Sequence, residues 1–238
     1  RSRLAFRVFN EVGGLKKTPI NEIGKNIIIK KILEESSENL SIYKNTSKQE
    51  GFVPKLNDMI CEFKQQGIIP IDLSLGIQKL EEDSILRMKL TDVAFIYNKF
   101  NSYLEGHYVD NEDQLNLLIE YIEQASFLEG AEIWIDGFHM FTPQTLKIIE
   151  KLLLKAEEVY ITFTMELKAK EWDKDLFHLP QDTFLRIRKI AQQLNVPENI
   201  IDLDIDEGKT TESSKEIVHI EEELFRYPYK QYTGEVEN

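Results

Sequence analysis

The residues with the clearest chemical potential follow one short apolar run. Residues 132–142 read Glu-Ile-Trp-Ile-Asp-Gly-Phe-His-Met-Phe-Thr, so Asp136 directly follows a predicted strand. Enzymes that hydrolyse nucleoside triphosphates place a carboxylate here, near the magnesium ion of the bound nucleotide. In active enzymes the next residue is normally Glu, which orients the attacking water, whereas this chain has Gly137. The pattern predicts a nucleotide-side acid without its catalytic neighbour, or alternatively an ordinary turn at a strand end.

Other segments imitate chemical motifs without completing them. Gly208-Lys209-Thr210 matches the end of a phosphate-binding loop, but Leu203 stands five residues before Gly208, where that loop requires glycine. The same acidic stretch fails as a calcium loop, because Ser213 replaces the terminal glutamate. A single cysteine, Cys61, excludes an internal disulfide and any cysteine-rich metal site. We therefore predict no metal site, and we expect Cys61 to be a buried structural thiol.

Positive charge is concentrated at the start of an acidic chain. The net charge is −13, yet residues 1–31 hold eight Lys or Arg against two Glu. This segment therefore carries +6, and the remaining residues carry −19. A local basic patch on an acidic body can meet a phosphate backbone. We predict DNA contact by the basic residues around the first helix: Arg1, Arg3, Arg7, Lys16 and Lys17. Solvated charges on two amphipathic helices are the alternative.

Apolar spacing predicts helices over most of residues 1–125. A stripe in residues 4–12 ends at Gly13-Gly14, and Ile20, Ile23, Ile27 and Ile28 form the next stripe. Helices are predicted over 52–66, where Gly67 ends the pattern, and over 85–105. Asp110 is the expected N-cap of a further helix. Residues 20–125 are therefore predicted to be a helical bundle without strands. The apolar seam of helix 85–105 is Leu86, Leu90, Val93, Tyr97, Phe100 and Leu104.

The pattern changes to strand, helix and strand after Gly130. Residues 131–135 and 159–165 are the predicted strands, and Thr142-Pro143 begins the helix between them. Such units pair in parallel, but two strands cannot form a parallel sheet buried on both faces. We therefore expect the chain to be a piece of a longer protein. Asp182 is the predicted cap of a later helix, and a last short helix is predicted over about 216–226.

Several sequence blocks, spread over nearly the whole chain, resemble segments of one protein family. They also follow one another in the order found in that family. Residues 134–144 carry the longest likeness, Trp-Ile-Asp-Gly-Phe-His-Met-Phe-Thr-Pro-Gln. The chain resembles the B subunit of the bacterial ATP-dependent helicase/deoxyribonuclease, the complex that resects double-strand breaks. The other matching blocks are 3–14, 51–53 with 62–64, 175–178 and 224–228.

This resemblance implies a helix-rich α/β fold. It consists of a partial P-loop helicase-like motor lobe, built on a parallel βαβ unit, with a large inserted helical subdomain. Residues 1–19 would be a basic helix of the motor lobe, 20–129 the inserted subdomain, and 130–238 the partial lobe, with an acidic flexible loop near 202–215. Asp136 would correspond to the acid on the magnesium side of the nucleotide. Gly137 departs from active helicases.

The resemblance also implies a function. The chain would be a non-catalytic scaffold and DNA-contacting segment of an ATP-dependent DNA exonuclease and helicase that works in DNA repair and recombination. Its partners would be DNA and the A subunit of the same helicase–nuclease complex. ATP with magnesium, and an iron–sulfur cluster, are implied for the longer protein and not for this piece. No run reaches the ~18–20 apolar residues of a membrane helix, and no targeting pattern is evident, so we expect a cytoplasmic location.

Two alternatives remain open at the level of sequence. The first is a protein-interaction module in which helices 52–66 and 85–105 dock a partner protein of the complex. The second is an enzyme in its own right, with Asp136 and His139 acting on a small ligand. That second alternative requires a deep pocket around both residues and a third catalytic partner, which the sequence does not reveal.

Overall fold

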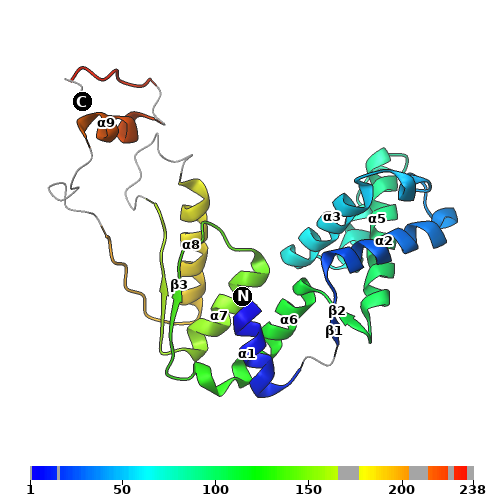
Figure 1. Ribbon diagram of the computed structural model, residues 1–238, viewed down its shortest axis with the longest axis horizontal. Coiled ribbons are helices and arrows are strands. Elements are labelled where there is room, and N and C mark those ends of the chain that lie inside the picture. Colours follow the sequence, from blue (N-terminus) through cyan, green and yellow to red (C-terminus); the bar gives the residue numbers. More distant parts are fainter. Residues whose placement is uncertain (1, 15–16, 166–176, 204–213, 225–227, 235–238) are drawn as a thin grey trace. The chain divides into compact units, whose positions relative to one another are not determined.

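The computed structural model describes residues 2–14, 17–165, 177–203, 214–224 and 228–234. Their fold is helix-rich α/β with short parallel strand pairs (Figure 1). The chain divides into a helical unit, Arg1–Gly130 with Thr142–Lys155, and a strand unit, Ala131–Phe141 with Ala156–Asn238. The division into residues 1–19, 20–129 and 130–238 stays a prediction.

The described elements follow one another as helices interrupted by two pairs of strands. In the helical unit, β1 (Thr18–Pro19) pairs in parallel with β2 (Tyr108–Val109). The strand unit contains β3 (Glu132–Ile135), β4 (Glu158–Ile161), α8 (His178–Gln193) and α9 (Lys215–Glu223). The helices of the helical unit are α1 (Ser2–Val12), α2 (Glu22–Glu35), α3 (Phe52–Gln66), α4 (Pro70–Ile77), α5 (Ile85–Leu104), α6 (Asn111–Tyr121) and α7 (Pro143–Lys155).

Side-chain caps explain where several of these helices begin. Asp110 Oδ1 accepts a hydrogen bond from the Asp113 amide at 2.8 Å, which confirms the predicted N-cap of α6. Ser84 caps α5 in the same way through the Arg87 amide, at 3.2 Å. These bonds satisfy amides that have no partner inside the helix. At the other end of α3, Gly67 adopts a left-handed conformation with φ +75°, as its predicted stop requires.

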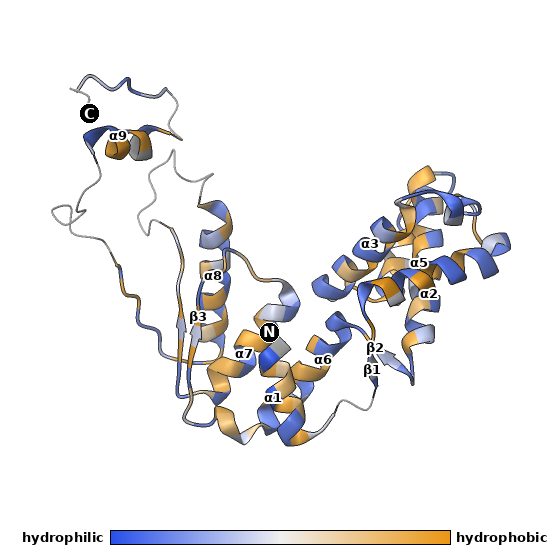
Figure 2. Cartoon of the chain, viewed as in Figure 1, coloured by the Kyte–Doolittle hydropathy of each residue, from blue (hydrophilic) through white to orange (hydrophobic). Residues whose placement is uncertain are grey.

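The core of the helical unit lies between α2, α3 and α5. Figure 2 shows apolar residues gathered where these helices lie side by side. Burying such side chains is the main source of stability for a unit of this kind. A buried carboxylate, Asp92, also accepts hydrogen bonds of 2.8–2.9 Å from the amides of Ser41, Ile42 and Tyr43. These bonds fix the backbone of residues 41–43 in the segment between α2 and α3. The buried core residues include Ile29, Ile32, Leu33, Leu56, Ile60, Val93, Ile96, Tyr97, Phe100 and Leu104.

The predicted apolar stripe of α2 is right in part. Ile20 and Ile28 pack against the core. Ile23 is 70% exposed and Ile27 is 63% exposed, whereas Ile29, which was not predicted, is fully buried. The inward stripe begins at Lys25, whose ammonium group lies 3.6 Å from the Glu112 carboxylate. A pattern built on hydrophobic residues alone passes over a buried, paired lysine and therefore misplaces part of the buried face of the helix.

One further expectation for residues 20–125 needs correction. The short strand β2 lies inside this region, where no strand was predicted, because two residues carry no readable alternation. A helix that the sequence pattern did not predict, α4, begins at Pro70. Proline is favoured at a first helical turn, where its missing N–H has no partner to lose. In α5 the predicted seam is buried from Val93 to Leu104, while Leu86 is exposed.

The strand–helix–strand order after Gly130 is confirmed. β3 and β4 pair in parallel, with Ile133 opposite Val159 and Ile135 opposite Ile161. The helix α7 begins at Pro143, and Thr142 Oγ1 accepts a hydrogen bond of 3.3 Å from the Thr145 amide. β4 ends at Ile161 and not at residue 165, because β3 ends at the opposite residue, Ile135.

The helix after β4 begins earlier than its sequence suggested. α8 starts at His178, so Asp182 lies in its second turn and not at its cap. There Asp182 pairs with Arg186 at 2.8 Å, one turn further along. The last predicted helix is confirmed as α9, while most of the predicted acidic loop near 202–215 lies outside the described residues. No described helix is both long enough and apolar enough to cross a membrane.

Candidate functional site

The first candidate site is the end of the β3–β4 pair. Asp136 follows β3, and Thr162, which follows β4, donates its hydroxyl hydrogen to Asp136 Oδ1. Because the strands are parallel, their carboxyl ends lie at the same edge, which is where ligands bind in open α/β sheets. Asp136 is exposed to solvent. The arrangement presents an oriented carboxylate at the carboxyl end of the strand pair.

Gly137 forms a turn at this edge and has no side chain that could take part in chemistry. Its φ is +75°, a left-handed conformation that glycine adopts without steric penalty. A Cβ atom built at this position would meet no atom within 4 Å. The space for a side chain is therefore open, and the backbone conformation is what opposes one. No group directly after Asp136 can orient a water molecule.

The alternative of an independent enzyme at Asp136 and His139 receives no support from this geometry. Both residues are exposed, and it is the backbone oxygen of His139 that accepts a hydrogen bond, from Thr183 Oγ1 at 3.3 Å. Among the described residues, no cluster of His, Cys, Asp or Glu has the arrangement of a metal site. Among the described residues near Asp136, no third catalytic partner is evident either.

The second candidate site is the basic first helix. Arg3 and Arg7 are exposed and lie four residues apart, so they share one face of α1. The guanidinium of Arg7 lies 4.1 Å from the centre of the Phe127 ring. Lys17 is exposed immediately before β1, while Arg1 and Lys16 lie outside the described residues. The structure thus places two of the predicted DNA-contacting residues on one face of α1, and both are exposed.

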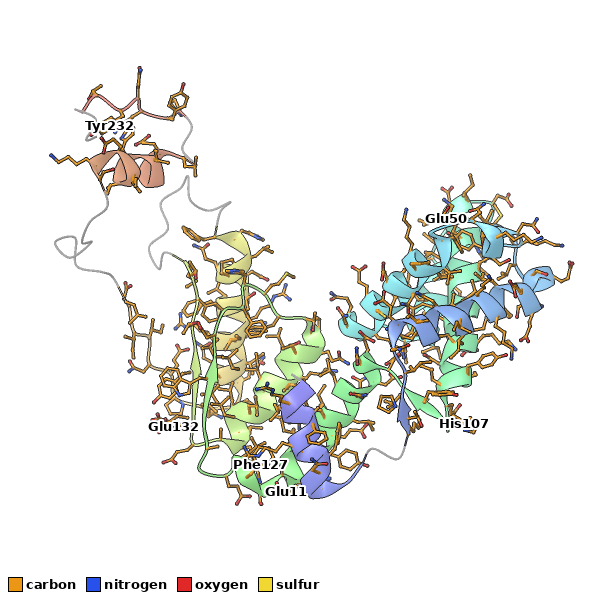
Figure 3. The ribbon with its side chains drawn as sticks, viewed as in Figure 1. Glu11, Glu50, His107, Phe127, Glu132 and Tyr232 are labelled. Atoms are coloured by element: carbon orange, nitrogen blue, oxygen red, sulfur yellow. The ribbon has the colours of Figure 1, made fainter. Side chains whose placement is uncertain are left out.

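A carboxylate at the end of α1 fixes that helix to the residues before β3. Glu11 Oε1 accepts from the Ser126 amide at 2.7 Å and from the Ser126 hydroxyl at 2.5 Å. The hydroxyl, followed by the amide, holds the pKa of Glu11 below its usual value. Figure 3 labels Glu11 and Phe127, which lie close together where α1 meets this segment.

A buried ionic cluster joins α3 to α6. Lys64 Nζ lies 2.6 Å from Asp110 Oδ2 and 2.8 Å from Asp113 Oδ2. Burial lowers the pKa of Lys64, but the two carboxylates outweigh that effect, so its pKa is raised. Burial and the neighbouring Asp110 raise the pKa of Asp113. Only the capping role of Asp110 was readable from the sequence, because its partner is 46 residues away.

A second part of the same region contains the cysteine. Lys25 Nζ donates to Cys61 Sγ at 2.9 Å and lies beside the Glu112 carboxylate. Cys61 is half-buried, and burial raises the pKa of its thiol. A raised pKa keeps the sulfur protonated and unreactive at neutral pH. Cys61 therefore has the environment of a structural thiol.

Comparison with known proteins decides the family. The family described as "ADDB, N-terminal" matches residues 2–221. The chain belongs to this family. It is 58% identical over 235 residues to the B subunit of the ATP-dependent helicase/deoxyribonuclease of Alkaliphilus oremlandii, covering 99% of this chain and 20% of that protein. The corresponding B subunit of Alkaliphilus metalliredigens is 56% identical over 237 residues, covering 100% of this chain and 21% of that protein.

A more distant relative gives the same result. The B subunit of the ATP-dependent helicase/deoxyribonuclease of Clostridium perfringens strain SM101 is 40% identical over 235 residues, covering 98% of this chain and 20% of that protein. The predicted resemblance to these B subunits is confirmed. The chain spans about a fifth of the length of these curated relatives.

Proposed function

We propose that this member of the ADDB N-terminal family is the helicase-like region of a helicase/deoxyribonuclease B subunit. In this role it is a non-catalytic scaffold and a DNA-contacting segment, and it works with the A subunit in the cytoplasm in double-strand-break repair and recombination. The relatives' name, which describes the B subunit of an ATP-dependent helicase/deoxyribonuclease, supports the general role. The observation that carries the non-catalytic part is Gly137, which follows the strand-end acid Asp136 and has no side chain to orient water.

The fold supports a partial motor lobe as the setting for this edge. Parallel strands joined in chain order through a helix are the building unit of P-loop lobes. An exposed Asp136 at their carboxyl ends fits the position of an acid beside the magnesium of a bound nucleotide. In a complete protein, ATP and magnesium would supply that chemistry. Asp136 would face that magnesium as a binding residue and would not be catalytic.

The residues of this chain do not fit an iron–sulfur cluster. Such clusters are held by about four cysteine thiolates, and this chain has only Cys61, whose sulfur accepts a hydrogen bond from Lys25. A cluster in the longer protein would have to use residues beyond these 238. No step of the proposed function depends on it.

Contact with DNA is proposed for the exposed face of α1. Arg3 and Arg7 present two guanidinium groups on one side of a helix, and Lys17 adds a third cation beyond it. Guanidinium groups bind phosphate oxygens in a fixed, bidentate geometry. The contact would be made with the backbone and would not select a sequence by itself.

The salt dependence of DNA binding tests this proposal. We expect the double variant Arg3→Gln/Arg7→Gln of the full-length protein to bind DNA more weakly. The slope of log K against log salt should fall by roughly 0.7–0.9 for each lost phosphate contact. The matched control is Lys55→Gln/Lys79→Gln, which removes two exposed charges of the helical unit away from α1. An unchanged slope in the arginine variant, or an equal change in the control, would contradict a DNA-contact role for α1.

A protein-docking role for the helical unit has one specific observation in its favour. Ile71 and Leu75 share a face of α4 and are both more than half exposed, as are Ile85 and Leu86 at the start of α5. α4 packs against α5. If the A subunit docks there, Ile71→Asp/Leu75→Asp will reduce its co-purification without changing the salt slope of DNA binding. Undiminished co-purification would remove the support for this second function.

A further inference from the structure

The hydroxyl group of Thr162 has no part in the function proposed so far. Thr162 follows β4 and lies one residue beyond the strand pair Ile135–Ile161, on the strand next to Asp136. Its amide donates to the Ile135 carbonyl at 3.1 Å, which continues the ladder of hydrogen bonds past the last paired residues. The backbone of Thr162 is therefore fixed beside the strand-end acid.

This hydroxyl occupies one oxygen of the Asp136 carboxylate. It donates to Oδ1, whereas Oδ2 has no hydrogen bond or ion pair with any described residue. Threonine is branched at Cβ, so its χ1 angle is restricted, and a hydroxyl on a fixed backbone has few directions in which to point. The carboxylate that accepts this bond is held in one orientation, and its second oxygen is left for another partner.

The surroundings of Asp136 leave room for a hydrated cation. Asp136 is exposed, and a Cβ atom built on the next residue, Gly137, would meet no atom within 4 Å. Magnesium keeps several of its water molecules and is held by one or two carboxylates together with the phosphates of a nucleotide. One carboxylate oxygen in open space meets this requirement, although no cluster of His, Cys, Asp or Glu among the described residues could hold a metal ion by itself.

An aspartate that nothing orients would bind such a cation less well. An exposed side chain exchanges among its rotamers, and binding through it must restrict that freedom. A hydrogen bond that fixes the carboxylate beforehand removes part of this cost. The same bond draws some negative charge from the carboxylate, which opposes binding. Positioning outweighs that effect, since removing the outer partner of a metal ligand weakens metal affinity by about 10- to 100-fold.

We propose that Thr162 is a positioning residue for a divalent cation. Its hydroxyl holds Asp136 through Oδ1, so that Oδ2 is presented to the magnesium ion of a nucleotide at the carboxyl ends of β3 and β4. Thr162 acts through Asp136 and does not contact the cation. This inference rests on the proposed role of Asp136 as a binding residue beside magnesium, and it adds the residue that orients that acid. The role requires no side chain at Gly137.

The affinity of the full-length protein for Mn²⁺ tests the inference without measuring catalysis. Mn²⁺ shares the oxygen ligands of Mg²⁺, and its electron paramagnetic resonance signal distinguishes free ions from bound ions. Titrations with and without a non-hydrolysable ATP analogue isolate the nucleotide-dependent site from other metal sites. We expect Thr162→Val, which keeps the shape and loses the hydroxyl, to weaken binding at this site about tenfold. Thr162→Ser keeps a hydroxyl donor and should bind within about twofold of the unmodified protein.

The substitution Asp136→Glu tests the same point without changing Thr162. It keeps the negative charge, but the extra methylene moves the carboxylate away from the position in which Thr162 holds it. We expect a loss of about tenfold here as well, so the inference stays testable if the valine variant does not fold. Combined with Asp136→Asn, Thr162→Val should cause no further loss, because the two residues act as a unit.

The matched control is Thr164→Val, the same change two residues further along the chain. Thr164 is exposed and its side chain has no hydrogen bond to any described residue. We expect its Mn²⁺ affinity to equal that of the unmodified protein. An equal loss in this control would show that the effect is not specific to Thr162 and would overturn the inference.

The remaining outcomes separate the inference from the role on which it rests. If Asp136→Asn weakens the nucleotide-dependent site while Thr162→Val and Asp136→Glu leave it unchanged, the inference is overturned and Asp136 remains a binding residue. If Thr162→Ser binds as weakly as Thr162→Val, the hydroxyl is not responsible, and the inference is overturned as well. If Asp136→Asn has no effect, the cation does not lie at this edge, and the proposed role of Asp136 is overturned together with the inference.

Discussion

At the end of β3, the backbone of Gly137 has a φ of +75°. Residues with a side chain adopt this conformation at a cost of about 1–2 kcal/mol. The position after Asp136 is therefore shaped for glycine, although no neighbouring atom would block a larger residue. We infer that this edge is maintained as a turn and not as a site for a water-orienting acid.

The substitution Gly137→Glu tests this view of the turn. We expect it to lower the free energy of unfolding by about 1 kcal/mol, as a non-glycine residue in this conformation does, and to produce no ATP hydrolysis in this chain. Gly137→Ala is the matched control, because it introduces the same backbone strain without an acid. Urea unfolding and a phosphate-release assay measure the two effects. Hydrolysis by the Glu variant alone would show that our placement of the nucleotide edge is wrong.

The buried lysine Lys64 supports a second prediction. Replacing it with Met would leave Asp110, whose side chain is 0% exposed, without its cation beside Asp113. Removing one partner of a buried pair costs about 3–5 kcal/mol. Lys44→Met is the control, because Lys44 and Glu38 form an exposed pair, worth about 0–1 kcal/mol. Urea unfolding should separate the two variants clearly, and equal losses would mean that the cluster is not stabilising.

Residue identity alone predicted local chemistry and missed distant partners. Asp110 was identified as a cap, because capping depends on an amide three residues away. Its ion pair with Lys64 was not predictable, since nothing in the sequence links residues 46 positions apart.

Among the elements, α2 was predicted as a helix correctly, but two of the residues assigned to its buried face, Ile23 and Ile27, are exposed. Its existence followed from the spacing of its isoleucines. Its inward face depends on Lys25, which is buried because Glu112 and Cys61 provide partners on other helices. Sequence patterns assign charged residues to the solvent-exposed face of a helix. A buried, paired lysine therefore leads to a wrong assignment of the buried face.

A pair of substitutions on α2 tests the corrected face. Ile29 is fully buried and Ile27 is 63% exposed, so the same change should have different effects two residues apart. We expect Ile29→Ala to lower the free energy of unfolding by about 2–4 kcal/mol and Ile27→Ala by less than about 0.5 kcal/mol. Chemical denaturation measures both. The reverse order would restore the face predicted from the sequence.

The attachment of α1 should depend on pH. Hydrogen bonds from Ser126 place the folded-state pKa of Glu11 below its ordinary value of 4.5. A lowered pKa gives stability that is fully present above the unfolded-state value and is lost as pH falls through the folded-state value. Exchange protection of the Ser126 amide should therefore decline as pH falls below about 4.5.

Glu11→Gln removes the titrating group while keeping an oxygen that accepts hydrogen bonds. The protection of Ser126 in this variant should be insensitive to pH over the same range. Glu120→Gln, an exposed change on α6, should retain the dependence of the unmodified chain. Hydrogen exchange corrected for intrinsic rates provides the measurement. A flat profile in the unmodified chain would mean that Glu11 does not anchor α1.

For the molecule as a whole, scattered sequence blocks were more informative than any single motif. The resemblance drawn from them is confirmed by the family match over residues 2–221. The strand–helix–strand segment was also predictable, because its alternation and its Thr142-Pro143 start are local signals. The compact units are not, since they depend on which distant segments pack together.

In the function proposed here, the strand-end acid Asp136 no longer takes part in catalysis. The rate of DNA-stimulated ATP hydrolysis by the full-length protein in its assembled complex, with the substitution Asp136→Asn, tests this directly. Asparagine keeps the oxygen that accepts from Thr162 and removes the charge that a magnesium ion requires. We predict a rate within about twofold of the unmodified complex, whereas loss of a working catalytic group costs about 10²-fold or more. A loss of that size would show that Asp136 still serves a working nucleotide site, contrary to the proposed role.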